Sequence, residues 1–285
     1  MIKDKCAMKI IENQRFDEER ALYESDGICL KNCRFDGEAD GESAFKESKN
    51  IITEECFFNL RYPFWHCNQA TLEKCEMTVN CRAPFWYTEG IHIKNSILHG
   101  VKAMRECRGV DISECDIIST EFGWSTGDMK ISDSKAEGEY FMLRAENIEL
   151  NNVEFKGKYS FQYVKNVTIE NSYLDTKDAF WHASGVTVRN STVKGEYLGW
   201  YSKNLTLENC KIIGTQPLCY CKGLKLVNCE MYETDLAFER SEVEATVNSH
   251  VLSIKNAYAG SITVSSVGEI IKDDDRAKCK ITLLS

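Results

Sequence analysis

The sequence predicts an all-β chain folded as a parallel β-helix, a solenoid of about twelve coils. Two adjacent stretches, residues 166–184 (NVTIENSYLDTKDAFWHAS) and residues 185–203 (GVTVRNSTVKGEYLGWYSK), repeat one 19-residue pattern. Apolar and polar residues alternate over the first half of each stretch, which is typical of a half-buried strand. A unit of this length has no room for a crossover helix. Each strand is therefore expected to pair in parallel with its counterpart in the next coil.

The repeat extends along nearly the whole chain, with unit starts spaced by about 19 residues and longer units early on. We expect a single domain. Residues 1–26 would form an N-terminal cap and partial first coil, residues 27–241 the coils, and residues 242–285 irregular C-terminal strands and a cap. The unit starts are Gly27, Asn50, Gln69, Gly90, Gly109, Asp128, Asn147, Asn166, Gly185, Asn204, Gly223 and Glu242.

Two positions near the middle of each unit explain much of the composition. The sixth is often Asn, as in Asn171 and Asn190, a residue that tolerates the left-handed backbone of a bend and can bond the amide of the next coil. The seventh is Cys or Ser in nearly every unit, as in Ser172 and Cys210, which predicts a buried column of small side chains. We expect the 14 cysteines to be reduced, because no export signal is evident.

A leucine-rich repeat is the alternative fold, since its ladder of leucines also ends in Asn. In this chain the Asn follows the last apolar strand residue by two positions instead of three. The second half of the unit holds Gly, aromatic residues and β-formers where a helix would be expected. Both features favour the β-helix.

Composition argues against several classes of partner. The formal net charge of −9, without a basic cluster, disfavours nucleic acid and anionic membranes. No apolar run approaches the roughly 20 residues of a membrane span, so we expect a soluble, cytoplasmic protein. We predict no cofactor and no metal site, because neither residues 219–221 (CYC) nor residues 66–67 (HC) have a second pair at zinc-ligand spacing. The Asp run at residues 273–275 is expected to be a solvated loop.

The second half of each unit ends in an aromatic segment, such as residues 179–183 (AFWHA). One column of these segments, from Glu24 to Glu239, is polar or amphipathic at every coil, and alternation with a small residue directs it outward. Aromatic faces pack on sugar rings and polar tips bond hydroxyl groups, so this face is a candidate glycan surface. The alternative is that the stacked rings only stabilise the sheet. The predicted ligand-binding residues are His66, Tyr87, Tyr163, Trp181, Tyr201 and Tyr220.

The column of Trp residues that contains Trp181 is harder to place. Strict alternation turns it inward, beside the small column. It also contains Arg105, which would need a partner such as Glu106 or Glu121 if it were buried.

Ordered phrases along the chain carry a family resemblance. They include FFNLRYPFWHC, EFGWSTGDMKISDS, DTKDAFWHA, KGEYLGWYSKNLTLENC and IIGTQPLCYCK. In these phrases the chain resembles a bacterial family of unknown function, number 3737 of the domains of unknown function, in the pectin-lyase-like superfamily. The resemblance implies a right-handed parallel β-helix. It carries over no catalytic residues, but relatives elsewhere in the superfamily often act on polysaccharides.

Charged residues interrupt the aromatic pattern near the middle of the chain, and these are the candidate catalytic residues. Arg105 or Arg144 would bind a substrate carboxylate, with Glu106, His182 or Tyr163 as acid or base. A lyase needs such a base and cation, and a glycosidase needs paired carboxylates. The Asn-Thr-Asp, Asp-Asp, Gly-His-Gly and Arg-Ile-Lys motifs of the superfamily's hydrolases do not occur here.

Two function classes stay open at this point. The first is a protein that binds or processes an oligo- or polysaccharide on the aromatic face, as a lyase or hydrolase if it is an enzyme. The second is a non-catalytic scaffold whose exposed face meets another protein or a second copy of the chain.

Overall fold

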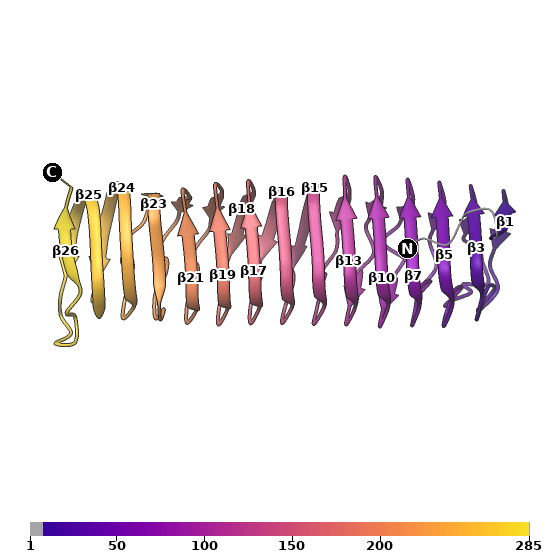
Figure 1. Ribbon diagram of the computed structural model, residues 1–285, viewed down its shortest axis with the longest axis horizontal. Coiled ribbons are helices and arrows are strands. Elements are labelled where there is room, and N and C mark those ends of the chain that lie inside the picture. Colours follow the sequence, from indigo (N-terminus) through magenta and orange to yellow (C-terminus); the bar gives the residue numbers. More distant parts are fainter. Residues whose placement is uncertain (1–7, 285) are drawn as a thin grey trace. The chain divides into compact units, whose positions relative to one another are not determined.

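The computed structural model describes residues 8–284 and divides into two compact units, unit 1 up to Gly138 and unit 2 from Glu139. Each unit is a parallel β-solenoid of strands and turns, without a helix among the residues described (Figure 1). The units have about 14 turns in all, spaced by about 19 residues. The predicted parallel β-solenoid is therefore confirmed and the leucine-rich repeat is excluded. The structure has more turns than the roughly twelve coils expected from the sequence, because strands already begin at Lys9 and continue after Glu242.

Unit 1 begins with short strands that repeat in pairs. They are β1 (Lys9–Glu12), β2 (Arg15–Phe16), β3 (Asp26–Lys31), β4 (Arg34–Phe35), β5 (Lys49–Glu54), β6 (Phe57–Phe58), β7 (Asn68–Glu73), β8 (Glu76–Met77), β9 (Phe85–Trp86), β10 (Glu89–Lys94), β11 (Ile97–Leu98), β12 (Met104–Arg105), β13 (Arg108–Ser113), β14 (Asp116–Ile118) and β15 (Gly127–Glu139).

Unit 2 has the same arrangement with longer strands at its C-terminal end. They are β16 (Glu146–Lys158), β17 (Lys165–Glu170), β18 (Tyr173–Lys177), β19 (Ser184–Arg189), β20 (Thr192–Lys194), β21 (Lys203–Glu208), β22 (Lys211–Ile213), β23 (Leu224–Tyr232), β24 (Glu242–Lys255), β25 (Ala259–Ile271) and β26 (Lys280–Leu283).

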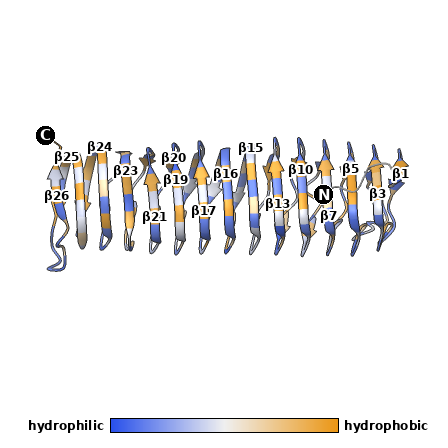
Figure 2. Ribbon diagram, in the orientation of Figure 1, coloured by the Kyte–Doolittle hydropathy of each residue, from blue (hydrophilic) through white to orange (hydrophobic). Residues whose placement is uncertain are grey.

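Equivalent strands of successive coils pair in parallel and in register. In unit 2, Val167 of β17 lies beside Val186 of β19, which lies beside Leu205 of β21, and all three side chains are buried. Alternate residues of these strands are apolar, so bands of both kinds cross each strand in Figure 2. Because a strand places alternate side chains on opposite faces, one apolar set fills the core of each coil.

Stacked rings and thiols fill the core. In unit 1, Phe64 stacks on Phe45 and on Phe85 at centroid distances of 4.9 and 5.0 Å. Each fully buried ring stabilises the fold by roughly 1.5–3 kcal/mol. The predicted column of small side chains is buried as well, as Cys210 and Cys229 show in unit 2. Burial raises the pKa of the Cys107 thiol to about 12, so this thiol stays protonated at neutral pH.

Asn residues occupy the bends, as predicted. Asn190, Asn209 and Asn228 have positive φ angles of 49°, 52° and 54°. Their amides form a ladder: the Asn209 side-chain N–H donates to Asn190 at 3.2 Å, and that of Asn228 donates to Asn209 at 2.8 Å. Asn adopts left-handed angles at a lower free-energy cost than most residues, which explains its recurrence at this position.

The third side of each coil carries the aromatic segments. The alternation of residues predicts a strand there, and the structure differs. In unit 2 it consists of turns in which every second residue has a positive φ, as at Asp178 (55°), Phe180 (61°) and His182 (55°). The N–H groups of these residues alternate in direction: that of Phe180 donates to Ser160 of the preceding coil, and that of His182 donates to Trp200 of the next. The aromatic segments are thus tied together by main-chain hydrogen bonds outside regular strands. Among the described residues of unit 1, β9 and β12 are the pair of short strands on this side.

The expected cap at residues 242–285 contains three further strands. β24 pairs with β23 and β25, and β25 pairs with β26, all in parallel, with register shifts between Val247 and His250. The Asp run at residues 273–275 lies between β25 and β26. The prediction of a single domain spanning both units stays a prediction, and residues 1–7 of the expected N-terminal cap lie outside the described residues.

Asp178 is the one buried residue with a carboxylate in the described part of the chain. The residue as a whole is 6% exposed. Its carboxylate accepts no hydrogen bond from the described residues, and its main-chain carbonyl accepts one from the Gln162 side chain at 3.1 Å. Burial raises the pKa of this carboxyl group, against the attraction of Lys177.

The Asn ladder allows a test of the bends. Asn209→Ala is expected to destabilise the protein by about 2 kcal/mol. Ala adopts the left-handed backbone only at a free-energy cost, and two amide hydrogen bonds are lost. Asn209→Gly, which keeps the backbone unstrained, should lose only about half of this. Urea unfolding measures both free energies, and equal losses for Ala and Gly would show that backbone strain contributes nothing.

Asp178 predicts a pH dependence of stability. A carboxyl group with a raised pKa in the folded state holds a proton that the unfolded chain has released, so stability falls as pH rises from the ordinary Asp pKa of about 4 through the raised value. Asp178→Asn should therefore be more stable than the parent protein at pH 7, and the difference should vanish below about pH 4. Thermal unfolding across this pH range tests the sign, and a variant less stable at pH 7 contradicts it.

Candidate functional site

Four stacked rings, three exposed and the last, Tyr220, half-buried, form a ladder on the third side of unit 2. Tyr163, His182, Tyr201 and Tyr220 stack in this order, with centroid distances of 4.9, 5.0 and 4.8 Å and interplanar angles of 13°, 8° and 11°. Tyr163 is 47% exposed and Tyr201 is 44% exposed. The ring ladder occupies the outward position that the sequence predicted for these four residues. The cause is the left-handed turn at each of them, with φ from 55° to 61°, and not the alternation of a strand.

The polar tips of the ring ladder have no protein partner among the described residues. Neither the phenol oxygens of Tyr163, Tyr201 and Tyr220 nor the ring nitrogens of His182 form a hydrogen bond there, whereas Tyr258 donates its phenol O–H to Asp274 at 2.9 Å. The tips therefore form a row of donors and acceptors about 5 Å apart, at the spacing of the coils.

The ring faces are less available than we expected. His182 lies between Tyr163 and Tyr201, and Tyr201 lies between His182 and Tyr220, so both faces of these two rings are covered by neighbouring rings. His182 and Tyr201 therefore leave no ring face free to pack on a sugar ring, and their roles in ligand binding stay predictions. Their edges and polar atoms are what a ligand would meet.

The Trp column lies beside the ring ladder and is half-buried. Trp181 and Trp200 stack at 5.4 Å with an interplanar angle of 5°. Their indole N–H groups donate to the main-chain oxygens of Tyr197 and Gln216 at 2.7 and 2.8 Å. Because these donors are used within the fold, neither Trp181 nor Trp200 offers a free indole N–H to a ligand. The Trp200 ring also packs edge-on against Tyr220 of the ladder at 5.3 Å.

The ring ladder occupies one outward-facing position in each coil, here called the outward row. In the coils next to the two ends of the ladder, this position is an arginine. Arg144 precedes Tyr163, and its main-chain N–H donates to Gln162 at 3.0 Å. Arg240 follows Tyr220, because Ser241 fills the small buried position after it and binds the Cys221 N–H at 2.9 Å. The sequence placed Glu239 in the outward row, which is wrong: this coil is one residue longer, and Glu239 belongs to the Trp column. Burial, with a smaller effect of nearby Glu239, raises the pKa of Tyr220.

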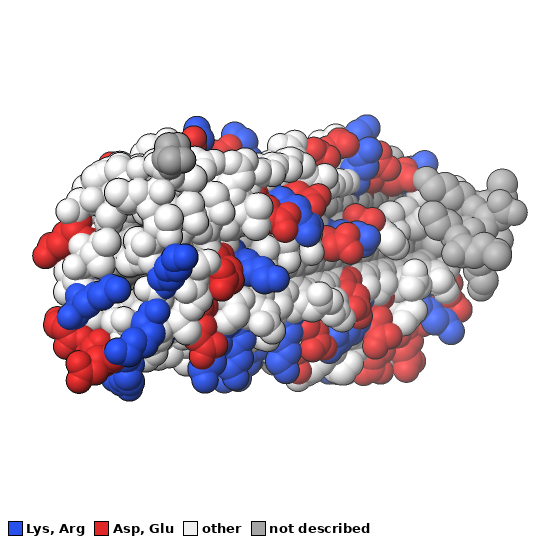
Figure 3. All heavy atoms as spheres, turned by 60° about the vertical axis from the view of Figure 1, so that its left-hand side comes forward, with Lys and Arg blue, Asp and Glu red and all other residues white. Residues whose placement is uncertain are grey.

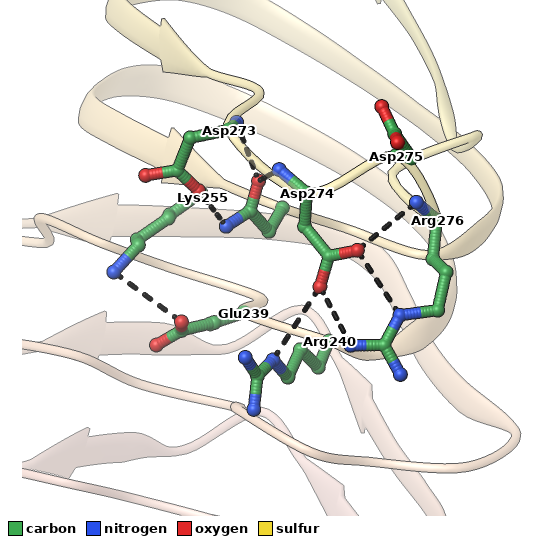
Figure 4. A pocket seen from close by; sticks show the side chains of 8 residues that line it. Glu239, Arg240, Lys255, Asp273, Asp274, Asp275 and Arg276 are labelled. Carbon is green, nitrogen blue, oxygen red and sulfur yellow. Dashed lines mark hydrogen bonds and ion pairs between the residues drawn. The ribbon is translucent and has the colours of Figure 1, made fainter.

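A polar hollow of about 670 Å³ adjoins Arg240 in unit 2 (Figure 4). Asp274 is at its centre: Arg276 donates to its carboxylate through Nε at 3.0 Å and Nη2 at 2.8 Å, and Arg240 Nε lies 3.8 Å away. The Arg276 side chain is the main cause of a strongly lowered Asp274 pKa. The lining residues are Glu239, Arg240, Lys255, Asn256, Asp273, Asp274, Asp275 and Arg276.

The sequence pattern does not predict this hollow. It indicates a solvated loop at the Asp run, and nothing in the repeat places Arg240 and Lys255 beside that run. The available signal was the arginine directly after the run, at Arg276, in a segment where the repeat weakens.

Unit 1 carries a shorter version of the aromatic surface. His66 and Tyr87 stack at 4.9 Å, and Trp65 and Trp86 stack at 5.9 Å. The indole N–H groups of Trp65 and Trp86 are buried without a partner among the described residues, unlike those of Trp181 and Trp200. The polar atoms of His66 and Tyr87 make no hydrogen bond in this part of the chain either.

Arg105 of unit 1 is engaged by its neighbours. Its guanidinium carbon lies 5.4 Å from the ring centroids of both Trp86 and Trp124, and its Nε lies 3.7 Å from Glu106. The Arg105 side chain is 30% exposed, so the expected burial is partial and Glu106 is the partner that the sequence suggested. Glu121 instead pairs with Lys102 at 3.0 Å.

The four candidate catalytic residues fall into two groups. Arg105 and Glu106 are adjacent in unit 1, and Arg144 and His182 are in unit 2, separated by Tyr163 in the outward row. At about 4.8 Å per coil, Arg144 and His182 stand roughly 10 Å apart along the row. Catalytic roles for these residues stay predictions.

Charges elsewhere on the surface are mixed. On the face shown in Figure 3, acidic and basic side chains are interspersed.

Among residues 8–284, no group of three or more His, Cys, Asp or Glu side chains is arranged to hold a metal ion. That part of the chain also has no helix long and apolar enough to cross a membrane.

Comparisons with known proteins give structural likenesses at low identity. No curated protein matches the chain. Tailspike protein 3 of bacteriophage CBA120 is 8% identical to this chain, with a TM-score of 0.49. The match covers 97% of this chain, and the chain spans 56% of the length of the tailspike chain. The catalytic domain of a GH87 α-1,3-glucanase, solved with nigerose, is 8% identical with a TM-score of 0.41, covering 98% of this chain and 68% of its own.

A tailspike mutant of Escherichia coli bacteriophage HK620, solved with a hexasaccharide, is 10% identical with a TM-score of 0.41, covering 92% of this chain and 70% of its own. Likeness this low carries no information on ligand or reaction. The family comparison is more direct, because it covers nearly every residue described. Residues 9–284 match the model of the protein family of unknown function DUF3737, and the chain belongs to that family.

Proposed function

We propose that the protein binds an extended glycan along the ring ladder of unit 2. The observation that carries this proposal is the row of four polar tips without protein partners among the described residues, on the exposed Tyr163, His182 and Tyr201 and the half-buried Tyr220. A glycan presents hydroxyl groups repeatedly along its length, and each hydroxyl both donates and accepts hydrogen bonds. A regular row of phenol and imidazole groups is complementary to such a ligand.

The ladder is also pre-organised. Stacking and main-chain hydrogen bonds hold each ring in place, and the Trp200 ring packs edge-on against Tyr201 and Tyr220. A surface that is ordered before binding loses little conformational entropy when a ligand arrives. His66 and Tyr87 of unit 1 are proposed as a second, shorter contact of the same kind.

Stabilisation of the solenoid explains the stacking but not the chemistry of the tips. Phe stacks in the core of both units with similar centroid distances, as Phe161 and Phe180 do at 5.2 Å. A ladder whose only role was structural would not require Tyr and His. The proposal is one of binding, because the described outward row of unit 2 contains no carboxylate pair of the kind that a glycosidase uses.

The proposal predicts the effect of removing the tips while keeping the rings. The triple variant Tyr163→Phe, Tyr201→Phe, Tyr220→Phe preserves the stack and removes three hydroxyl groups. Its affinity for glycans should fall at least about tenfold, since each lost hydrogen bond contributes about 1 kcal/mol. Binding is measured on hexameric gluco-, manno-, galacto- and xylo-oligosaccharides and on hexagalacturonate.

Tyr173→Phe is the matched control, because Tyr173 is 42% exposed on β18, outside the ladder. It should leave binding unchanged. Equal affinities for the triple variant and the parent protein would remove the ladder as the site. If no glycan binds and the triple variant changes the oligomeric state measured by light scattering, the surface is a self-association face instead.

A further inference from the structure

We infer that the hollow beside Arg240 binds one neutral sugar unit of the ligand that lies along the ring ladder. The inference rests on the proposed glycan binding and assigns to it a second contact and a class of sugar. The hollow's volume of about 670 Å³ is within the roughly 300–1,000 Å³ of ordinary small-molecule sites.

The hollow is next to the end of the ring ladder. The main-chain N–H of Tyr220 donates to the oxygen of Glu239 at 2.7 Å, which places Tyr220 one coil from Glu239 and Arg240. Both of these residues line the hollow, and both act electrostatically on the Tyr220 phenol. A ligand lying along the ladder toward Tyr220 therefore reaches the hollow without leaving unit 2.

The floor of the hollow is fixed by a buried amide. Asn256 is 3% exposed, and its side-chain oxygen accepts hydrogen bonds from the main-chain N–H groups of Asp273 and Asp274 at 3.1 and 3.2 Å. Its side-chain N–H donates to the Asp273 carboxylate. Arg276 closes the same turn by packing over the Tyr258 ring at 4.9 Å and binding Asp274. The charged side chains of residues 273–276 thus stand on a turn that hydrogen bonds hold in place.

Two groups that line the hollow retain unused hydrogen-bonding capacity. Arg240 approaches Asp274 only at 3.8 Å, beyond hydrogen-bond distance, and no other acceptor is within reach of its guanidinium among the described residues. The Asp275 carboxylate, which is exposed, has no hydrogen bond or ion pair in that part of the chain. Arg240 thus offers free donors to the hollow, and Asp275 offers free acceptors at its rim, where Figure 4 shows the Asp275 side chain beyond Asp274 and directed away from Arg240.

The charge balance favours a neutral ligand. The lining contains three cationic side chains, Arg240, Lys255 and Arg276, and four anionic ones, Glu239 and residues 273–275. Lys255 pairs with Glu239 at 3.3 Å, and Arg276 pairs with Asp274. A charged ligand of either sign would meet like charges, whereas hydroxyl groups can accept from guanidinium N–H groups and donate to carboxylates.

The test uses the full chain, and calorimetric titration with the five hexamers named above. Asp275→Asn and Arg240→Gln are each expected to weaken binding of a neutral hexamer about tenfold, the loss typical of one charge-assisted hydrogen bond. Asp275 is the cleaner variant, because it has no described contact whose loss would disturb the fold. Asp111→Asn and Arg82→Gln, two exposed residues of unit 1, should leave affinity unchanged. Raising the salt concentration tenfold should change affinity less than about twofold, as expected for an uncharged ligand.

The result separates this inference from the proposed function. If the Tyr→Phe triple variant loses binding and both hollow variants keep it, the ladder is the site and the hollow is not. If only the hollow variants lose binding, the ladder proposal fails and the hollow remains. Binding of hexagalacturonate alone, with a steep dependence on salt, would overturn the assignment to a neutral sugar. Absence of binding by every hexamer would overturn both proposals.

Discussion

In-register parallel pairing between successive coils is the constraint on which the rest of the structure depends. Val167, Val186 and Leu205 occupy one register position in β17, β19 and β21, and Ile169, Val188 and Leu207 occupy another. Because like positions are stacked about 4.8 Å apart, any residue type that recurs in the sequence becomes a column in space. A column of Val and Leu builds a core, a column of Asn builds an amide ladder, and a column of Tyr and His builds a surface.

This constraint also explains why the ring ladder has the properties of a recognition surface. A single exposed Tyr would be mobile, but Tyr201 has rings on both faces at 5.0 and 4.8 Å. The stacking that orders the rings also removes their faces from contact with a ligand. What remains is a line of edges and polar atoms, and the chemistry of the surface is therefore one of hydrogen bonding more than of stacking.

Departures from the repeat give the ladder its ends. Arg144 and Arg240 replace rings in the outward row, and the extra residue in the coil that ends at Arg240 moves Glu239 into the Trp column. The loop between β25 and β26 then brings residues 273–276 to the same place, where the Asn256 side chain holds it. A repeat alone would produce a uniform face. The local exceptions create a hollow with its own balance of charges.

The period, the parallel pairing, the Asn bends and the buried Cys and Ser column can all be predicted from the sequence, because each follows from the spacing of residue types within one unit. The sequence also identified Tyr163, His182, Tyr201 and Tyr220 as outward-facing. The folded chain was needed to show that left-handed turns hold these rings outward and that Trp181 and Trp200 donate their N–H groups to Tyr197 and Gln216. It was also needed to show that the Arg105 guanidinium lies over two indoles. The hollow, too, could be found only in the folded chain. Its residues come from segments about 15 to 35 positions apart in a region without a clear repeat, and no spacing rule in the sequence connects them.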